Sequence, residues 1–220
     1  MLKQRLWKGK GLFSINADFE EKCDEAELLI QHIDDLSKER GNVNRVSILK
    51  SAFILLLYNM LESTSVLVLE RVHEKVSSHQ YNELSDKLKK IFIEFYLLNE
   101  NSKKQQGKLD LIISNNLTFP LFSDYNKKVN LFSGNLDARQ LSSVTDRYGI
   151  GKITSNNKDM LLTIKNKRNK IAHGEEMFKE SCRNLTIREL NLIKVATFDA
   201  LKQMLNMTKL YFEQKRYIHR

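Results

Sequence analysis

Apolar residues recur every three to four positions along much of the chain, which is the period of an amphipathic helix. The first such stretch begins near Asp18, where Asp18 and Glu21 match a capping box, and Gly41 is its natural end. The second covers about 43–76, and its middle, ILLLYNMLESTSVLVL, is apolar on most sides. A helix that is apolar all round is typical of the centre of a bundle.

Three more helices follow from the same periodicity. One is expected around 83–98 and one over about 158–173. The last and longest begins at Thr186, because Thr186 and Glu189 form a second capping-box pattern before a long apolar face.

The segment 100–157 lacks this regularity. It mixes Asn, Ser, Gly and the single proline, Pro120, with short apolar pieces. We therefore expect a long irregular excursion here, with one short helix around 137–148. With one proline and eight glycines in the whole chain, the sequence predicts an all-α, up-and-down helical bundle.

Length and charge narrow the class of protein. The 220 residues suit one domain spanning 1–220, and 36 Lys and Arg against 27 Asp and Glu give a net charge of +9. This charge favours an acidic partner such as nucleic acid or a membrane surface. The basic arm at 1–15 and the tail KRYIHR could reach nucleic acid, although charged ends also serve solubility alone.

Targeting and metal-binding patterns are not found. The start MLKQRLWKGKGLF has no continuous apolar region, and the run AFILLLY at 52–58 is far shorter than the roughly 20 residues of a membrane span, so we expect a cytoplasmic protein without a membrane segment. Cys23 and Cys182 form no CxxC pair, and the five histidines show no metal-ligand spacing. We expect two reduced thiols, no metal and no cofactor.

The stretch RNKIAHG at 168–174 allows two interpretations. Basic residues followed by Gly174 are ordinary features of a helix C-terminus. However, helical geometry places Arg168 in the apolar arc that contains Leu161 and Ile164, so its side chain points at the core or at a partner. Because burying an unpaired guanidinium is costly, Arg168 needs a carboxylate, a subunit partner or a bound phosphate.

Two further polar residues share this last turn. Asn169 and His173 are four positions apart and lie on one face beside Arg168. Arginine offers fixed charge and paired donors to a phosphate, histidine titrates near neutral pH, and asparagine can orient either group. Arg168, Asn169 and His173 are therefore candidates for a site that holds a phosphate and moves a proton.

Glu62, inside the apolar second helix, is a weaker candidate. A carboxylate there needs a partner, and Arg168 could form a pair inside the bundle that holds the guanidinium in place. Alternatively, Glu62 lies on a solvated strip with Asn59 and Ser63.

The R-x4-H arrangement of RNKIAH, at the end of the penultimate helix, resembles the HEPN superfamily. The segments GNLDARQLSSVTDRYGIG at 134–151 and RNKIAHGEEMF followed by TIREL look like MAE-type HEPN nucleases of bacterial conflict systems. The resemblance extends from about Asp18 to the C-terminus. It implies a bundle that forms a homodimer, brings two R-x4-H motifs together and cleaves RNA without a metal, with Arg168, Asn169 and His173 as the matching site residues.

The expected reaction is attack by a ribose 2′-OH on the adjacent phosphodiester, as in a toxin or a phage-defence effector. His173 of the two subunits would supply base and acid, and Arg168 would stabilise the charge on the phosphoryl oxygens. Tyr125, Phe132 and Tyr148 are candidate surfaces for stacking RNA bases.

The sequence lacks one motif found in part of the HEPN superfamily. It also leaves two functions other than a nuclease open. The R-x4-H-x-Tyr pattern of tyrosine-modified toxins is absent, since Glu175 follows two residues after His173. An antitoxin or regulatory partner is therefore undefined. The alternatives to a nuclease are a non-catalytic RNA-binding module and an adaptor that recruits another protein.

Overall fold

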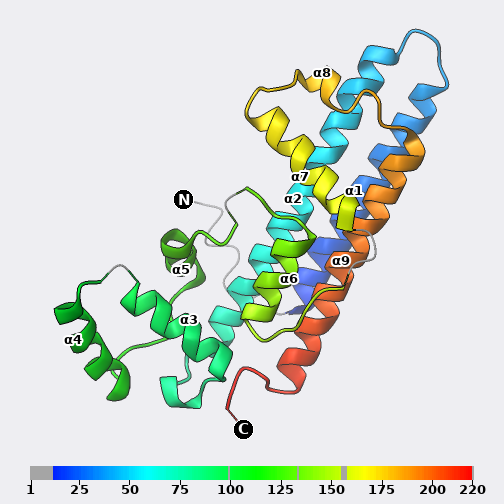
Figure 1. The fold of residues 1–220 in the computed structure, drawn as a ribbon. Helices are drawn as coiled ribbons and strands as arrows, with labels where there is room; N and C mark the ends of the chain where they lie inside the picture. The colour runs from blue at the N-terminus through cyan, green and yellow to red at the C-terminus, as the bar shows by residue number, and fades with distance from the viewer. Residues whose placement is uncertain (1–11, 99, 133, 155–157, 220) are drawn as a thin grey trace, which may run out of the picture.

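The structure, a computed structural model, describes residues 12–98, 100–132, 134–154 and 158–219 (Figure 1). Within these residues the chain forms α-helices, one 3-10 turn at Tyr81–Glu83 and no β-strand, so the predicted all-α class is confirmed. The helices are α1 Leu12–Ser37, α2 Val43–Val76, α3 Asp86–Leu97, α4 Ser102–Ile113, α5 Phe122–Val129, α6 Ala138–Arg147, α7 Lys158–Ala172, α8 Phe178–Ser181 and α9 Ile187–Glu213.

Three long helices form the body of the molecule. α1, α2 and α9 run side by side, and α7 packs across α2 and α9 (Figure 1). Their shared core contains fully buried side chains such as Leu57, Leu61 and Val68 of α2 and Leu201 of α9. Truncating one such leucine to alanine typically costs about 2–5 kcal/mol.

α2 is the central helix that the sequence predicted, with the same boundaries. It is the one helix among the described residues that is long and apolar enough to cross a membrane by length and composition. However, 56% of its most apolar window is buried inside the fold, as in the core helix of a bundle. Its apolar character is therefore explained by packing against α1, α7 and α9.

The predicted start of the first helix is wrong. α1 begins at Leu12, so Asp18 lies inside the helix and accepts a hydrogen bond from Lys22 Nζ at 2.6 Å instead of capping it. The reason is that Ile15 and Phe19, four residues apart, both bury their side chains and extend the core face upstream. Of the predicted basic arm, 12–15 are helical and 1–11 lie outside the described residues.

The irregular excursion predicted over 100–157 is also largely wrong. It contains α4 and α5 as well as α6, the one helix predicted there. α6 begins as expected, because the Asp137 carboxylate accepts the backbone N–H of Gln140 at 2.9 Å. α4 was not predictable from periodicity, since its only buried residue is Ile112.

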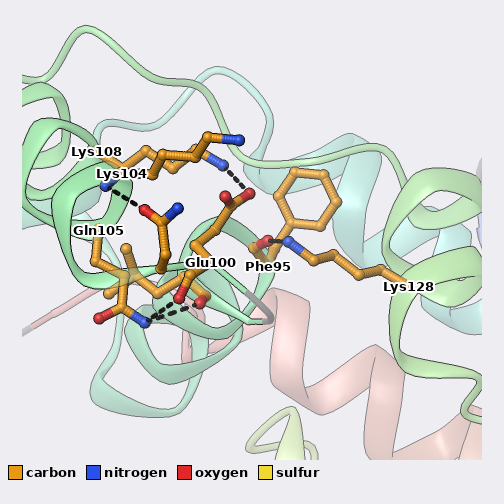
Figure 2. A network of polar contacts seen from close by, with 8 residues as sticks. Phe95, Glu100, Lys104, Gln105, Lys108 and Lys128 are labelled. Carbon is orange, nitrogen blue, oxygen red and sulfur yellow. Dashed lines mark hydrogen bonds and ion pairs between the residues drawn. The ribbon is translucent and has the colours of Figure 1, made fainter.

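Polar contacts attach α4 to α3, as Figure 2 shows. The Gln105 amide of α4 donates to the carbonyl oxygen of Leu97, the last residue of α3, at 3.4 Å and to that of Glu100 at 3.0 Å, and the Glu100 carboxylate accepts a hydrogen bond from Lys108 at 2.5 Å. Nearby, the Lys128 ammonium of α5 donates to the Phe95 carbonyl at 2.6 Å and lies 5.5 Å from the centre of the Phe95 ring. Because α4 buries only Ile112, hydrogen bonds and charge contribute much of its attachment to the fold.

The aromatic residues proposed to stack RNA bases are in the core, so that prediction is wrong. Tyr125 and Tyr148 are 0% exposed and Phe132 is 7% exposed. The two tyrosines are buried because their hydroxyl groups have partners inside: Tyr148 with His73 and Tyr125 with Glu94.

The C-terminal tail packs against the fold within the described residues. Tyr217 is buried, and the Arg216 guanidinium donates to the carbonyl oxygens of Gly149 and Ile150. Arg216 and Tyr217 in the middle of the KRYIHR tail are therefore attached to the fold, whereas Lys215 and His219 are exposed.

The predicted cap of the last helix is confirmed. Thr186 Oγ1 accepts the Glu189 N–H at 3.2 Å, and Glu189 accepts the Thr186 N–H at 2.7 Å, which is a complete capping box. Cys23 and Cys182 are both free and buried, as expected for reduced thiols.

Candidate active site around Arg168 and His173

α7 ends where the sequence predicted. Leu161 and Ile164 are fully buried and fix the helix against α2 and α9. The helix closes with Gly174 in the left-handed region at φ +69°, and the backbone N–H of His173 still donates to the Asn169 carbonyl at 2.9 Å. His173 therefore occupies a defined position in the turn that ends α7.

The Arg168 side chain is half-buried, and one of its three guanidinium nitrogens, Nη1, is hydrogen-bonded within the fold. Its central carbon lies 4.8 Å from the centre of the Tyr58 ring of α2, a cation–π contact. Nη1 donates to Asn169 Oδ1 at 3.1 Å and to the Gly134 carbonyl at 3.5 Å. Nη2 and Nε make no hydrogen bond to any other residue in the described part of the chain, so this edge of the fork is available to an anion.

Asn169 acts on Arg168 in this arrangement. Its oxygen accepts from the guanidinium, and its Nδ2 donates to Asn135 Oδ1 at 3.0 Å. Of the two roles considered for this amide, the geometry supports orientation of the arginine.

Tyr58 and Glu62 form the α2 side of the site. Tyr58 is 1% exposed, and its hydroxyl oxygen accepts the Leu136 N–H at 3.4 Å. Glu62, one turn further along α2, is half-buried; burial raises the pKa of its carboxyl group, and the nearby positive charge of Arg168 partly opposes this. The two residues interact through charge but form no direct ion pair.

The neighbouring lysines of α7 differ from Arg168 in having carboxylate partners. The pairs are Lys165–Asp137 at 2.8 Å, Lys167–Glu176 at 3.5 Å and Lys170–Glu176 at 2.6 Å. The hydrogen bond from Lys170 lowers the pKa of Glu176 to about 2. Because these charges are largely compensated, Arg168 is the better candidate for binding an external anion.

His173 is exposed, and its imidazole makes no hydrogen bond or ion pair to another residue that the structure describes. His173 is five positions after Arg168, a step that on a helix corresponds to roughly 140° of rotation and about 7.5 Å along the axis. Within one chain the two side chains therefore point in different directions.

Arg168, Asn169, His173 and Glu62 were predicted from the sequence, whereas Tyr58, Gly134 and Asn135 were not. Gly134 and Asn135 lie in the segment that carried the family resemblance, although no role followed from it. Tyr58 gave no signal, because an aromatic residue in an apolar helix is ordinarily a core residue. Across the described ranges, no group of three or more His, Cys, Asp or Glu side chains is arranged to hold a metal ion.

The fold and this site define an all-α domain with an R-x4-H motif at the end of a core helix. The family model described as RiboL-PSP-HEPN matches residues 17–213, so the chain belongs to this HEPN family. Comparison with the curated proteins and with the solved structures gave no match. Membership of the HEPN superfamily is thereby confirmed, the narrower MAE-type resemblance stays a prediction, and a HEPN domain suggests cleavage or binding of RNA.

Proposed function

We propose that this protein is a metal-independent endoribonuclease of a bacterial conflict system, a toxin or phage-defence effector acting in the cytoplasm as a homodimer. One observation carries the proposal. Arg168 is held on Tyr58 by contacts to one end of its guanidinium, while the other edge is open and the exposed His173 follows at the end of the same helix.

The reaction begins with removal of the proton from a ribose 2′-OH by neutral His173 of one subunit. The 2′ oxygen then attacks the adjacent phosphorus, and the bond to the 5′ oxygen breaks as His173 of the second copy donates its proton to that oxygen. The products are a 2′,3′-cyclic phosphate and a 5′-OH end. The open edge of Arg168 donates hydrogen bonds to the phosphoryl oxygens, where negative charge increases in the transition state.

A second copy is needed because of the direction of the side chains. Arg168 and His173 of one chain diverge by roughly 140° around α7, so one chain does not surround a phosphate with an arginine and two histidines. Pairing two copies through the exposed end of α7 would bring two motifs to one site. The asymmetric roles of base and acid then follow from two copies of one residue.

The test is incubation of the purified protein, with EDTA present, with an RNA oligonucleotide and with the same oligonucleotide carrying 2′-deoxyribose at the scissile position. We expect cleavage of RNA only, with cyclic phosphate and 5′-OH ends. Equal cleavage of both substrates would exclude the proposed attack by the 2′-OH.

Replacing Arg168 with lysine is expected to lower kcat/KM by about 100-fold. Lysine keeps one positive charge but loses the planar fork, the stacking on Tyr58 and the paired donors toward phosphate. The measurement is initial-rate kinetics with a single-site RNA substrate. Lys202→Arg, an opposite exchange at an exposed position of α9, is the control and should leave the rate unchanged. Full activity of Arg168→Lys would show that charge alone is sufficient.

A non-catalytic RNA-binding module is the second candidate. It is favoured by the His173 imidazole, which has no orienting partner among the described residues, whereas a catalytic histidine is usually held by another group. This alternative predicts RNA binding that weakens steeply with salt and produces no new RNA ends.

A further inference from the structure

The segment Gly134–Asp137 lies alongside α7, the helix that carries the R-x4-H motif, and each of its residues contacts α7 or α2. The Gly134 carbonyl accepts from Arg168 and the Asn135 side chain accepts from Asn169. The Leu136 N–H donates to the Tyr58 hydroxyl, and the Asp137 carboxylate pairs with Lys165. We call this segment the 134–137 wall.

Gly134 has a steric reason to be glycine. A Cβ atom at this position would lie 2.8 Å from Arg168 Nη1 and 3.4 Å from Cζ and Nη2. All three contacts are to the end of the Arg168 side chain, so an added methyl group would displace the guanidinium and leave the surrounding backbone in place. The Arg168 guanidinium thus occupies the space that a side chain at position 134 would fill.

The wall and the Tyr58 ring together decide which edge of Arg168 faces outward. Tyr58 supports one face of the guanidinium, while Gly134 and Asn169 occupy Nη1. Asn169 is in turn held by Asn135 at 3.0 Å. Nη2 and Nε have no hydrogen-bond partner among the described residues, and two parallel donors on one edge match the two oxygens of a phosphate.

We propose that Gly134, Asn135 and Tyr58 are positioning residues that act through Arg168 and present its Nη2–Nε edge to the scissile phosphate of RNA. The inference rests on the proposed nuclease function, which it deepens by assigning residues outside the R-x4-H motif. None of the three residues needs to touch the substrate.

The chain offers a matched pair of glycines for the test. Gly134 and Gly41 both have positive φ, +75° and +88°, so alanine strains the backbone similarly at both. At Gly41 the added Cβ meets nothing within 4 Å, whereas at Gly134 it meets Arg168. Comparing Gly134→Ala with Gly41→Ala therefore isolates the displacement of the guanidinium from the strain of the turn.

We expect Gly134→Ala to lower kcat by between about 10-fold and 100-fold with little change in KM, because a misplacement of about 1 Å is enough for such a loss. Gly41→Ala should retain the wild-type kcat. Asn135→Ala, a change at an exposed residue, should lower kcat in the same direction by releasing Asn169. Wild-type kcat in both Gly134→Ala and Asn135→Ala would overturn the inference.

A second readout does not depend on cleavage. The NMR resonance of the Arg168 Nε–H group, assigned by its loss in Arg168→Lys, should shift in Gly134→Ala and stay unchanged in Gly41→Ala. In the wild type it should also shift when RNA with 2′-deoxyribose at the scissile position is added. A wild-type protein that does not cleave RNA would contradict the nuclease proposal but not the positioning of Arg168. An unchanged Arg168 resonance in Gly134→Ala would contradict the positioning role but not the nuclease proposal.

Discussion

Replacing His173 with alanine is expected to reduce RNA cleavage by roughly four orders of magnitude, because a general acid or base typically contributes about 10²–10⁴-fold and this single change removes both. The fold should be unaffected, since the side chain is exposed and makes no hydrogen bond to a described residue. The measurement is single-turnover cleavage of an RNA oligonucleotide at saturating protein. His32→Ala, a change to an exposed histidine on α1, is the matched control and should cleave at the wild-type rate.

A mixed dimer separates a shared site from two independent ones. In a tandem-tagged heterodimer with one wild-type chain and one His173→Ala chain, each shared site would lack either its base or its acid. We expect the heterodimer to lose at least about 100-fold in rate. If each chain carried a complete site, the heterodimer would keep half of the wild-type rate, and the proposed division of roles between subunits would be wrong.

The parts of the fold that the sequence predicted correctly are those that depend on neighbours along the chain. The extent of α2 follows from apolar residues that recur at helical spacing from Val43 to Val76, and the start of α9 follows from the Thr186–Glu189 capping box. α4 was missed for the opposite reason. It buries only Ile112 and is attached by contacts such as Lys108–Glu100, which leave no periodic signal in the sequence.

The same distinction applies to the candidate site. Arg168 stood out because a charged residue fell within an apolar arc of its own helix. Its supports come from elsewhere: Gly134 is 34 residues away in the chain, and Tyr58 belongs to a different helix. Such contacts depend on how α2, α7 and the 134–137 wall pack together, and one sequence does not encode that packing in any local pattern.

Acidification is expected to destabilise the protein through His73. This buried residue of α2 faces the segment that contains α5. Its Nδ1 is 2.8 Å from the Pro120 carbonyl, which can only accept, so Nδ1 donates and Nε2 accepts from the Tyr148 hydroxyl at 2.8 Å. The rings of Phe119, Phe122 and Tyr125 surround it. Burial lowers the pKa of His73 from 6.5 to about 4, so the folded protein holds the neutral imidazole.

The sign and size of the change in stability follow from the difference between the pKa of His73 in the unfolded chain, 6.5, and in the folded protein, about 4. Below pH 6.5 the unfolded chain takes up a proton at His73, whereas the folded chain does not until about pH 4. The contribution to stability is therefore complete above pH 6.5 and is lost as the pH falls between these values. At about 1.4 kcal/mol per pH unit, the loss amounts to roughly 3 kcal/mol in the free energy of unfolding.

His73→Gln isolates this contribution from the carboxylates that titrate in the same interval. A glutamine amide can donate to the Pro120 carbonyl and accept from the Tyr148 hydroxyl, but it has no proton to gain. Urea unfolding at a series of pH values from 7 to 4 should show a free energy of unfolding that falls less steeply for His73→Gln than for the wild type. Parallel curves for the two proteins would mean that His73 is protonated equally in both states, contrary to its position among buried aromatic rings.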